Sequence, residues 1–470
     1  MLKKESNSEL ELTWPVTINE LHETRDNFLN DMYEWILEQD IDKNKSAELI
    51  WLNIGSIAHE FMRIFNGYLV INRLSSNKNT FLESKFSNKL FVDISLNRQP
   101  DFQYKVRHML TGLVYEKPIK KIGRLVKHNI FKQKLKYKPK VFINPKKDIV
   151  TFSSSPLIEE HASIKNKNVI ISRIDEWFPT GMLNDNSSLL ECNNEIVHVI
   201  KIIEKRFESA GVTLPSFITA HFQKYLELIL GFTRNYMNKL YEHKKNLPSE
   251  FWSGTGGIIY NRIMSRVVSK NGGLSIGHDH GTGYGWWKTN IQTINELNYV
   301  DKFITFSKEQ AEGQKKNINL KFLVHKNDKY SISPMHENDI YKNHINIIRH
   351  SRLPSKVIKK VMYVPTCYTR DETYFLPLLC DYAAIDWQTR LVEFLDNNDF
   401  EVFFKPHPDD RGPELFPYKD YNNVTIVQEP FEKVLDSVDL LIFDYLQTSC
   451  IVGAVKSNLP IVLIDFPRLV

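Results

Sequence analysis

The sequence predicts an α/β fold, with strands and helices in alternation over most of the chain. From about residue 138 onward, short apolar runs alternate with amphipathic segments, which is typical of strands joined by helices. Residues 361–464 repeat this pattern most clearly. Two apolar runs in that region stop at polar side chains, as strands do at the carboxyl edge of a parallel sheet, where open α/β sheets bind ligands.

Length and composition narrow the class of protein. The chain has 470 residues, 42% of them hydrophobic and 25% charged, which suits about two or three globular domains. No run reaches the roughly 20 apolar residues of a membrane-spanning helix, and residues 1–6 lack the apolar core of a signal peptide. We therefore expect a cytoplasmic protein, with four widely spaced cysteines that indicate neither disulfides nor a zinc site.

Residues 1–115 predict helices, such as 19–37, and contain one acidic pair with a recognisable spacing. Asp40 and Asp42 form a DxD pair, the spacing at which metal-dependent sugar transferases hold a divalent ion. The pair follows a helix in a polar stretch rather than a strand end. We therefore expect no metal, and a metal site at this pair is the alternative.

A basic segment spans residues 117–147, with a dozen Lys and Arg and no Asp or Glu. Such a segment attracts nucleic acid, an anionic membrane surface or an acidic polymer, and a solvated face is the simpler interpretation. Nucleic acid is the weakest choice, because no zinc finger, heptad-linked basic region or RNP-type strand accompanies the segment. A membrane-proximal enzyme that handles acidic glycans fits better.

The central region, from about 138 to 325, predicts further strands and helices. A long helix is expected to run through Lys244, and a helical segment ending at Ser269 leads through a turn to a glycine-rich run. The strands are expected at 140–144, 149–153, 169–174, 215–220, 251–254 and 274–276.

The run 277–285 contains four glycines and the sequence His278-Asp279-His280. Glycine permits close approach of the backbone to a ligand, and histidine titrates near neutral pH. Three interpretations remain open: a metal site that needs a further distant ligand, a structural turn, or a loop at a domain cleft. In the last, His280 or Asp279 is a general base or orients the substrate. The residues that would line the acceptor side are His278, Gly281, Thr282, Gly283 and Tyr284.

Residues 361–464 predict a Rossmann-like series. Lys405 and His407 leave the second strand, and the fourth is followed by polar residues that begin a helix. Those residues are Asp444, Thr448 and Ser449. The strands are expected at 361–365, 401–405, 424–427, 439–443 and 459–464, and the helices at 386–395, 431–437 and 449–456.

Two strand exits in this series carry groups that can bind phosphate. N–H groups and hydroxyls at a helix start bind anions, and a donating His407 can stabilise charge on a leaving phosphate. Ordinary N-capping is the alternative for Thr448 and Ser449, and a kinked strand exit is the alternative for residues 405–408. The coincidence of the two exits favours a nucleotide-phosphate site, to which we also assign Glu429.

These motifs resemble those of GT-B-type glycosyltransferases of bacterial surface polysaccharide synthesis, such as capsule polysaccharide transferases and teichoic-acid CDP-glycerol glycerophosphotransferases. Residues 405–408 match their HP dipeptide after a basic strand end, and residues 444–449 loosely match a DY(S/T)S-like helix start. Residues 280–282 match an HG(T) turn. The glycine-rich run is also similar to the QHGGxYG turn of transferases from nonulosonate surface-glycan loci, with Asp279 in place of the glutamine. The resemblance covers about residues 250–465.

The resemblance implies two Rossmann-like domains facing a cleft, with a mixed helical N-terminal region. Residues 1–325 would form the acceptor-side domain and residues 326–470 the nucleotide-donor domain. The implied activity is a metal-independent glycosyltransferase without a cofactor, which moves a CMP-activated acidic sugar onto an anionic glycan or lipid-linked acceptor. The sugar would be of the Kdo, sialic or pseudaminic/legionaminic type. His407 and the helix start would bind the phosphate, Lys405 would add charge, and His280 or Asp279 would act on the acceptor hydroxyl.

Three alternatives stay open. CDP-glycerol or CDP-ribitol phosphotransfer keeps the architecture and moves a polyol phosphate. A non-hydrolysing UDP-sugar epimerase shares the two-domain fold and needs no acceptor. The third is a catalytically inactive nucleotide- or glycan-binding assembly protein. The sequence ends at Val470 without the C-terminal helix by which GT-B domains cross back, so a truncated C-terminus is also expected.

Overall fold

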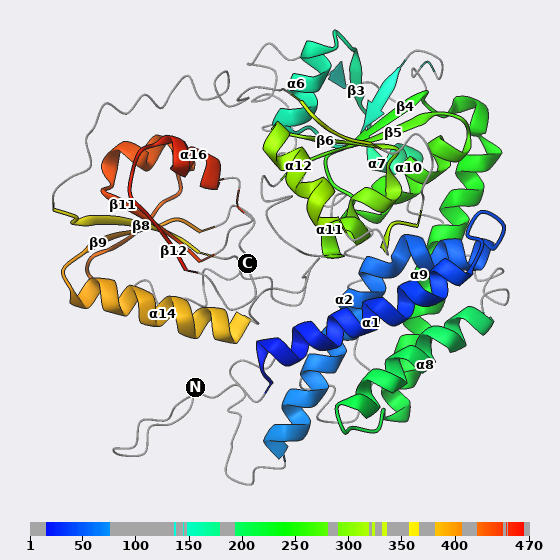
Figure 1. Ribbon diagram of the computed structural model, residues 1–470, viewed down its shortest axis with the longest axis horizontal. Coiled ribbons are helices and arrows are strands. Elements are labelled where there is room, and N and C mark those ends of the chain that lie inside the picture. The colour runs from blue at the N-terminus through cyan, green and yellow to red at the C-terminus, as the bar shows by residue number, and fades with distance from the viewer. Residues whose placement is uncertain are drawn as a thin grey trace. The chain divides into compact units, whose positions relative to one another are not determined.

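The computed structural model has an α/β fold built on two parallel-stranded sheets (Figure 1), which confirms the α/β part of the predicted fold class, while the GT-B arrangement stays a prediction. The chain forms two compact units, and the predicted boundary between residues 325 and 326 stays a prediction. The units are Met1–Ile276 with Ile294–Asp301 and Lys321–Asp328, and Gly277–Thr293 with Lys302–Leu320 and Lys329–Val470. The structure describes residues 16–75, 136–137, 144, 148–178, 193–280, 290–318, 322–324, 331–335, 357–365, 381–406, 421–444, 448 and 450–464.

Long helices pack against one another in the first unit (Figure 1). They are α1 (Ile18–Glu38), α2 (Lys45–Ser75), α8 (Asn193–Ser209) and α9 (Ser216–Glu242). In their core the buried ring of Phe61 contacts the rings of Phe28 and Phe207. α1 confirms the helix expected over 19–37 and begins at Thr17, whose hydroxyl accepts the N–H of Glu20. Among the helices that the structure describes, none is long and apolar enough to cross a membrane.

The prediction of a strand at 215–220 is wrong, because these residues form the start of helix α9. Pro215 takes the N-cap position, where its missing N–H removes no helical hydrogen bond. Ile218 and Phe222 are buried at i, i+4 spacing on one face of the helix. Isoleucine and phenylalanine favour strands locally, but packing of a whole helical face overrides that preference.

The first sheet has seven strands, in the order β1-β3-β2-β4-β5-β6-β7. The strands are β1 (Lys136–Tyr137), β2 (Ile149–Thr151), β3 (Val169–Ile171), β4 (Glu250–Ser253), β5 (Leu274–His278), β6 (Lys302–Thr305) and β7 (Ser331–Pro334). The helices between them are α6 (Pro156–Ile164), α7 (Ile174–Trp177), α10 (Ile259–Lys270), α11 (Asn290–Asn295) and α12 (Lys308–Asn317), with 3-10 turns at Lys244–Asn246 and Leu297–Tyr299. The strands expected at 149–153, 169–174, 251–254 and 274–276 are confirmed with shifted ends, whereas most of 140–144 lies outside the described residues.

The loop that joins β4 to α10 requires a glycine at position 256. The Gly256 N–H donates to the Glu296 carboxylate at 2.5 Å, and a Cβ here would lie 1.9 Å from the Asn295 carbonyl oxygen. Backbone atoms cannot move aside as a side chain does, so we expect Gly256→Ala to lower the unfolding free energy by about 3 kcal/mol in urea titrations. Gly254→Ala is the matched control, because its Cβ would meet the Ser153 hydroxyl at 3.5 Å. Equal urea midpoints for the two variants would contradict this account.

A buried histidine on α6 makes the stability of the first unit depend on pH. His161 is 6% exposed and stacks on Trp252, with ring centroids 4.3 Å apart. Burial, with smaller effects of Lys165 and Lys167, lowers the pKa of His161 from 6.5 to about 4. Between these two values the unfolded chain binds a proton that the folded protein does not, so stability falls as the pH drops through that window.

We expect this histidine to remove up to about 3 kcal/mol of unfolding free energy as the pH falls from 6.5 to 4. His161→Phe keeps a ring against Trp252 and removes the titration. Chemical unfolding at several pH values should therefore give a flatter profile for the variant over that window. An unchanged slope would show that the pH dependence comes from other groups.

The second unit contains a five-stranded parallel sheet in the order β10-β9-β8-β11-β12. The strands are β8 (Lys360–Val364), β9 (Glu401–Phe404), β10 (Val424–Ile426), β11 (Leu440–Phe443) and β12 (Ile461–Leu463). The helices are α14 (Asp381–Asn397), α15 (Phe431–Val434) with a 3-10 turn at Leu435–Ser437, and α16 (Cys450–Lys456). The chain starts in the middle strand, runs to one edge, then returns to the other side of β8. This is the order of a doubly wound sheet, which confirms the predicted Rossmann-like series.

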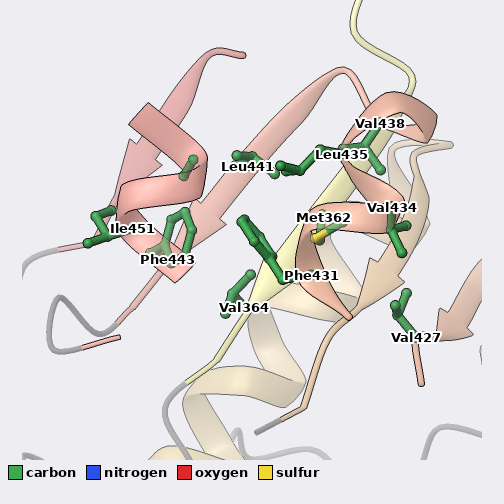
Figure 2. Close-up of a cluster of buried hydrophobic side chains, with 11 residues drawn as sticks. Met362, Val364, Val427, Phe431, Val434, Leu435, Val438, Leu441, Phe443 and Ile451 are labelled. Atoms are coloured by element: carbon green, nitrogen blue, oxygen red, sulfur yellow. The ribbon is translucent and has the colours of Figure 1, made fainter. Parts of the chain in front are cut away.

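Helices cover both faces of this second sheet (Figure 1). Met362 and Val364 of β8 join the apolar cluster beneath α15 and α16 (Figure 2). Val361 and Tyr363 alternate with them and pack against the α14 side. Because both faces of the sheet are buried, its strands are nearly continuous apolar runs, and this pattern predicts them from the sequence. The strand order reverses between β8 and β11, where such sheets bind ligands at their carboxyl ends.

Candidate functional site

Lys405 lies at the carboxyl end of β9, next to β8, on the edge of the second sheet at which open α/β sheets bind ligands. The apolar alternation of β9 buries Val402 and Phe404, and Lys405 follows with only 9% of its surface exposed. Its backbone N–H donates to the Tyr363 carbonyl at 2.9 Å, and its ammonium group donates to the Pro406 carbonyl at 3.4 Å. Among the described residues no carboxylate lies within ion-pair distance of this ammonium group.

Lys360, at the opposite end of the β8–β9 pair, has a different environment from Lys405. Lys360 begins β8 and pairs with Glu401, the first residue of β9, at 3.2 Å, with both side chains about half exposed. That cation is solvated and paired, whereas Lys405 is buried, and among the described residues its ammonium group makes only a long bond to a neutral carbonyl. Buried charges in proteins are normally paired or functional, so Lys405 is a candidate anion-binding group.

Asp444 lies at the carboxyl end of β11, next to β8 in the sheet. Its side chain is fully buried, and its carboxylate accepts a hydrogen bond from the Tyr363 hydroxyl. Asp444 is therefore held inside the sheet edge, and a direct contact with a solvent-borne ligand would require it to move. Glu429, after β10, is exposed.

Thr448 lies just before α16, which begins at Cys450. The Thr448 hydroxyl accepts the N–H of Cys450 at 3.3 Å, which is an ordinary capping contact. Burial raises the pKa of the Cys450 thiol, while a hydrogen bond from Thr448 and the charge of Lys405 act in the opposite direction. His407 and Ser449 lie outside the described residues.

The second candidate group follows β5. His278 and Asp279 are fully buried, and the Asp279 N–H donates to the Ile304 carbonyl of β6 at 2.9 Å. Gln310 of α12 donates from Nε2 to the Asp279 carboxylate at 3.5 Å. The Gln310 carbonyl oxygen also accepts the Ser307 N–H in a capping box, which fixes the amide.

His280 is the exposed member of this group. Desolvation by the surrounding protein lowers the pKa of the His280 ring, while the Asp279 carboxylate has a smaller opposing effect. The ring is therefore neutral at pH 7, with a surface that a substrate can reach. Gly281, Thr282, Gly283 and Tyr284 lie outside the described residues, so their acceptor role stays a prediction.

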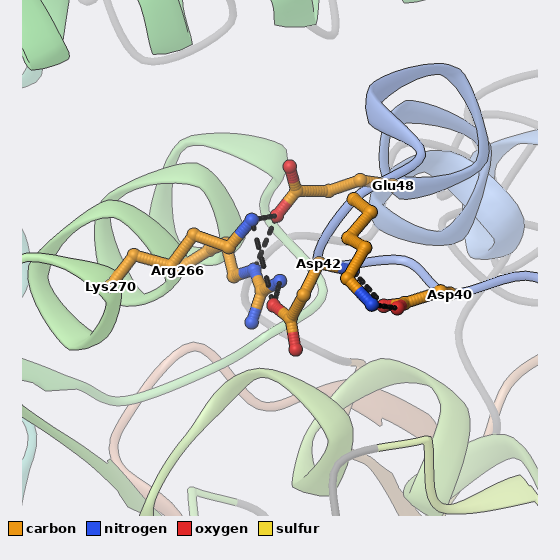
Figure 3. A network of polar contacts seen from close by, with 6 residues as sticks. Asp40, Asp42, Glu48, Arg266 and Lys270 are labelled. Carbon is orange, nitrogen blue, oxygen red and sulfur yellow. Dashed lines mark hydrogen bonds and ion pairs between the residues drawn. The ribbon is translucent and has the colours of Figure 1, made fainter.

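Asp40 and Asp42 are both engaged in ion pairs (Figure 3). Asp40 pairs with Lys43 at 2.8 Å. Asp42 pairs with Arg266 at 2.7 Å and Lys270 at 3.6 Å, which links the α1–α2 corner to α10. These carboxylates already have cationic partners, which argues against the alternative of a divalent-ion site. Within the described stretches no group of three or more His, Cys, Asp or Glu residues has a metal-binding arrangement.

Sequence reasoning missed two residues that hold the candidate groups in place. Gln310 could have been found, because Ser307-x-x-Gln310 is a capping-box signature. Tyr363 had no such signal, since its hydroxyl meets Asp444 across 81 positions of sequence. Most of the basic segment 117–147 lies outside the described residues, so its membrane role stays a prediction.

At its carboxyl edge this doubly wound sheet carries a buried lysine that has no carboxylate partner among the described residues, and this edge is where open α/β sheets bind ligands. Residues 64–466 match the model of the LIC12162 family transferase, so the chain belongs to this transferase family. No curated protein and no solved structure matches the chain.

Proposed function

We propose that the protein is a glycosyltransferase that uses a nucleotide-activated sugar, preferably a CMP-activated acidic sugar of the Kdo, sialic or pseudaminic/legionaminic type. Membership of a transferase family supports group transfer, and the doubly wound sheet supports a nucleotide donor. A GT-B arrangement of two domains and a surface-glycan acceptor belong to the same proposal.

Lys405 is the observation that carries the proposal. Burying Lys405 to 9% exposure is costly when no described residue offers its ammonium group a carboxylate partner, and a bound phosphate would supply a counter-charge. The carboxyl edge of a doubly wound sheet is where such sheets bind nucleotides. Lys405 is therefore assigned to the donor phosphate, with His407, Thr448 and Ser449 as further donors. These groups stabilise charge on the leaving nucleotide without requiring a metal.

His280 is assigned as the general base for the acceptor hydroxyl. A base needs a neutral ring that the substrate can reach, and burial removes His278 and Asp279 from direct contact. The lowered pKa of His280 leaves the ring neutral at pH 7. Asp279, held by Gln310, then supports the charge that develops on the ring. The basic segment 117–147 would draw the enzyme to the inner face of the membrane and an anionic or lipid-linked acceptor.

Product analysis by mass spectrometry tests this function. The protein is incubated with CMP-, CDP- and UDP-activated donors and a panel of surface glycans, and both the released nucleotide and the mass added to the acceptor are measured. Release of CMP with addition of an acidic sugar supports the proposal. Phosphorus in the glycan product indicates polyol-phosphate transfer, and an isomerised UDP-sugar indicates an epimerase. Nucleotide binding without turnover indicates an assembly protein.

A further inference from the structure

The strand order of the first sheet also reverses, between β2 and β4. From β2 the chain passes to β3 on one side, whereas β4 lies on the other side and is followed outward by β5, β6 and β7. β2 is parallel to both of its neighbours, so the carboxyl ends of β3, β2 and β4 share one edge. Open parallel sheets bind ligands outside the strand ends at such a reversal. The loops after β2 and β4, residues 152–155 and 254–258, are therefore a candidate site within the first unit.

These two loops lie against each other, and the first of them presents a hydroxyl. A Cβ on Gly254 would lie 3.5 Å from the Ser153 hydroxyl oxygen. The Thr151 hydroxyl accepts the Ser153 N–H at 3.3 Å and donates to the Ser153 carbonyl at 2.7 Å, which fixes the backbone at this point. Ser153 is partly exposed, and among the described residues its hydroxyl makes no hydrogen bond. A ligand can therefore reach this hydroxyl.

A second group without a partner lies behind the loop that follows β4. Asn261, in the first turn of α10, is 2% exposed, and its Nδ2 donates to the Thr255 carbonyl at 2.7 Å. The amide is therefore held against the loop, while its Oδ1 has no hydrogen-bond partner in the part of the chain that the structure describes. A buried oxygen without a donor costs free energy. A hydroxyl on a ligand, or a water that the ligand holds, would supply the donor.

The charges around the two loops select the class of ligand. The loops contain no Lys or Arg. The Glu159 carboxylate accepts the Ser154 hydroxyl, and the Glu296 carboxylate accepts the Thr255 hydroxyl at 3.1 Å. Carboxylates repel phosphate and accept hydrogen bonds from hydroxyl groups. This edge is therefore opposite in charge to the edge that carries Lys405, and it suits an uncharged, hydroxyl-rich ligand.

We propose that the carboxyl edge between β2 and β4 binds an uncharged sugar through the hydroxyl groups of its ring. The Ser153 hydroxyl contacts the sugar at the surface, and the Glu159 carboxylate and Asn261 Oδ1 accept hydrogen bonds from its side. That the bound sugar is the acceptor of the transfer rests on the proposed function, whereas the binding itself does not. The acceptor would then end in an uncharged sugar residue.

The test is a titration of the full chain, followed by saturation-transfer NMR. The probes are the methyl glycosides of glucose, galactose, mannose and N-acetylglucosamine, and the 6-phosphate of each glycoside. We expect at least one glycoside to bind, and its 6-phosphate to bind at least about tenfold more weakly, because the site holds carboxylates and no cation. Equal or tighter binding of the phosphate overturns the inference, and so does a protein that binds none of the glycosides.

Ser153→Ala connects the binding to this edge of the sheet. It removes one hydroxyl and should raise the Kd of the bound glycoside about three- to tenfold, the range for one hydrogen bond, without lowering the melting temperature. Ser249→Ala is the matched control and should leave the Kd unchanged. Ser249 is also partly exposed, its hydroxyl makes no hydrogen bond with any described residue, and it precedes β4 at the opposite edge of the sheet. An unchanged Kd in Ser153→Ala, or the same increase in both variants, overturns the inference.

A CMP titration of the same proteins separates this site from the donor site. Ser153→Ala should bind CMP as the wild type does, because Lys405 belongs to the other sheet. Wild-type protein that binds a glycoside but no nucleotide contradicts the proposed function and leaves the sugar site standing. Wild-type protein that binds CMP but none of the glycosides overturns the sugar site alone.

Discussion

Glu48→Ala is expected to lower the free energy of unfolding by about 3–5 kcal/mol, the largest stability effect we foresee. The Glu48 side chain is 5% exposed, and it accepts from Arg266 Nε at 2.5 Å and pairs with Lys270 at 2.8 Å (Figure 3). Arg266 is itself buried, with its guanidinium 5.2 Å from the centre of the Trp51 ring. Removing the carboxylate leaves a buried guanidinium without its main counter-charge.

Urea unfolding of Glu48→Ala and Asp42→Ala provides the comparison. Asp42 contacts the same two cations, but its side chain is 61% exposed. When this carboxylate is removed, water can replace much of its interaction with the cations. We expect Asp42→Ala to cost about 1 kcal/mol or less. Similar losses in the two variants would show that burial does not set the strength of this network.

His280→Ala is expected to lower turnover about 10²- to 10⁴-fold, the range for loss of a general base, while nucleotide affinity stays unchanged. The variant removes the exposed ring and leaves the donor residues in place. Initial rates and CMP titrations measure the two quantities separately. His243→Ala, at an exposed position after α9, is the control for loss of a surface histidine. Turnover near the wild-type value would remove His280 from the chemistry.

The pH profile gives an independent check on this assignment. A base works in its neutral form, and the pKa of His280 is lowered from its ordinary value of 6.5 by partial desolvation. Wild-type turnover should therefore hold down to pH 6.5 and decline at lower values. A decline centred above pH 6.5 would point to another base.

The second sheet could be predicted from sequence because its strands are buried on both faces. Segments such as 361–365 and 439–443 are apolar runs, and Lys405 is conspicuous where such a run stops. The helix at 215–220 could not be recognised, since its short-range preference favours a strand and only packing of α9 decides otherwise.

The candidate site was only partly predictable. Lys405 and Asp444 are visible as strand exits, but burial decides what each can do, and burial depends on the whole fold. Asp444 was expected to bind the donor, which stays a prediction, and no local signal indicates that the Tyr363 hydroxyl donates to its carboxylate. The sequence around Asp42 does not indicate that its carboxylate pairs with Arg266, because the two residues lie 224 positions apart.

In the proposed function, the buried Lys405 binds a nucleotide phosphate. A thermal-shift panel of CMP, CDP, UDP, GDP and ADP against wild type and Lys405→Met tests it most directly. We predict that one nucleotide, CMP, stabilises the wild type by about 2.7 kcal/mol at a hundredfold excess over its Kd. Lys405→Met should lose that shift while its unliganded melting temperature stays at or above the wild-type value, because methionine buries no charge. A shift retained in Lys405→Met, or a wild type that responds to none of the nucleotides, would contradict the claim.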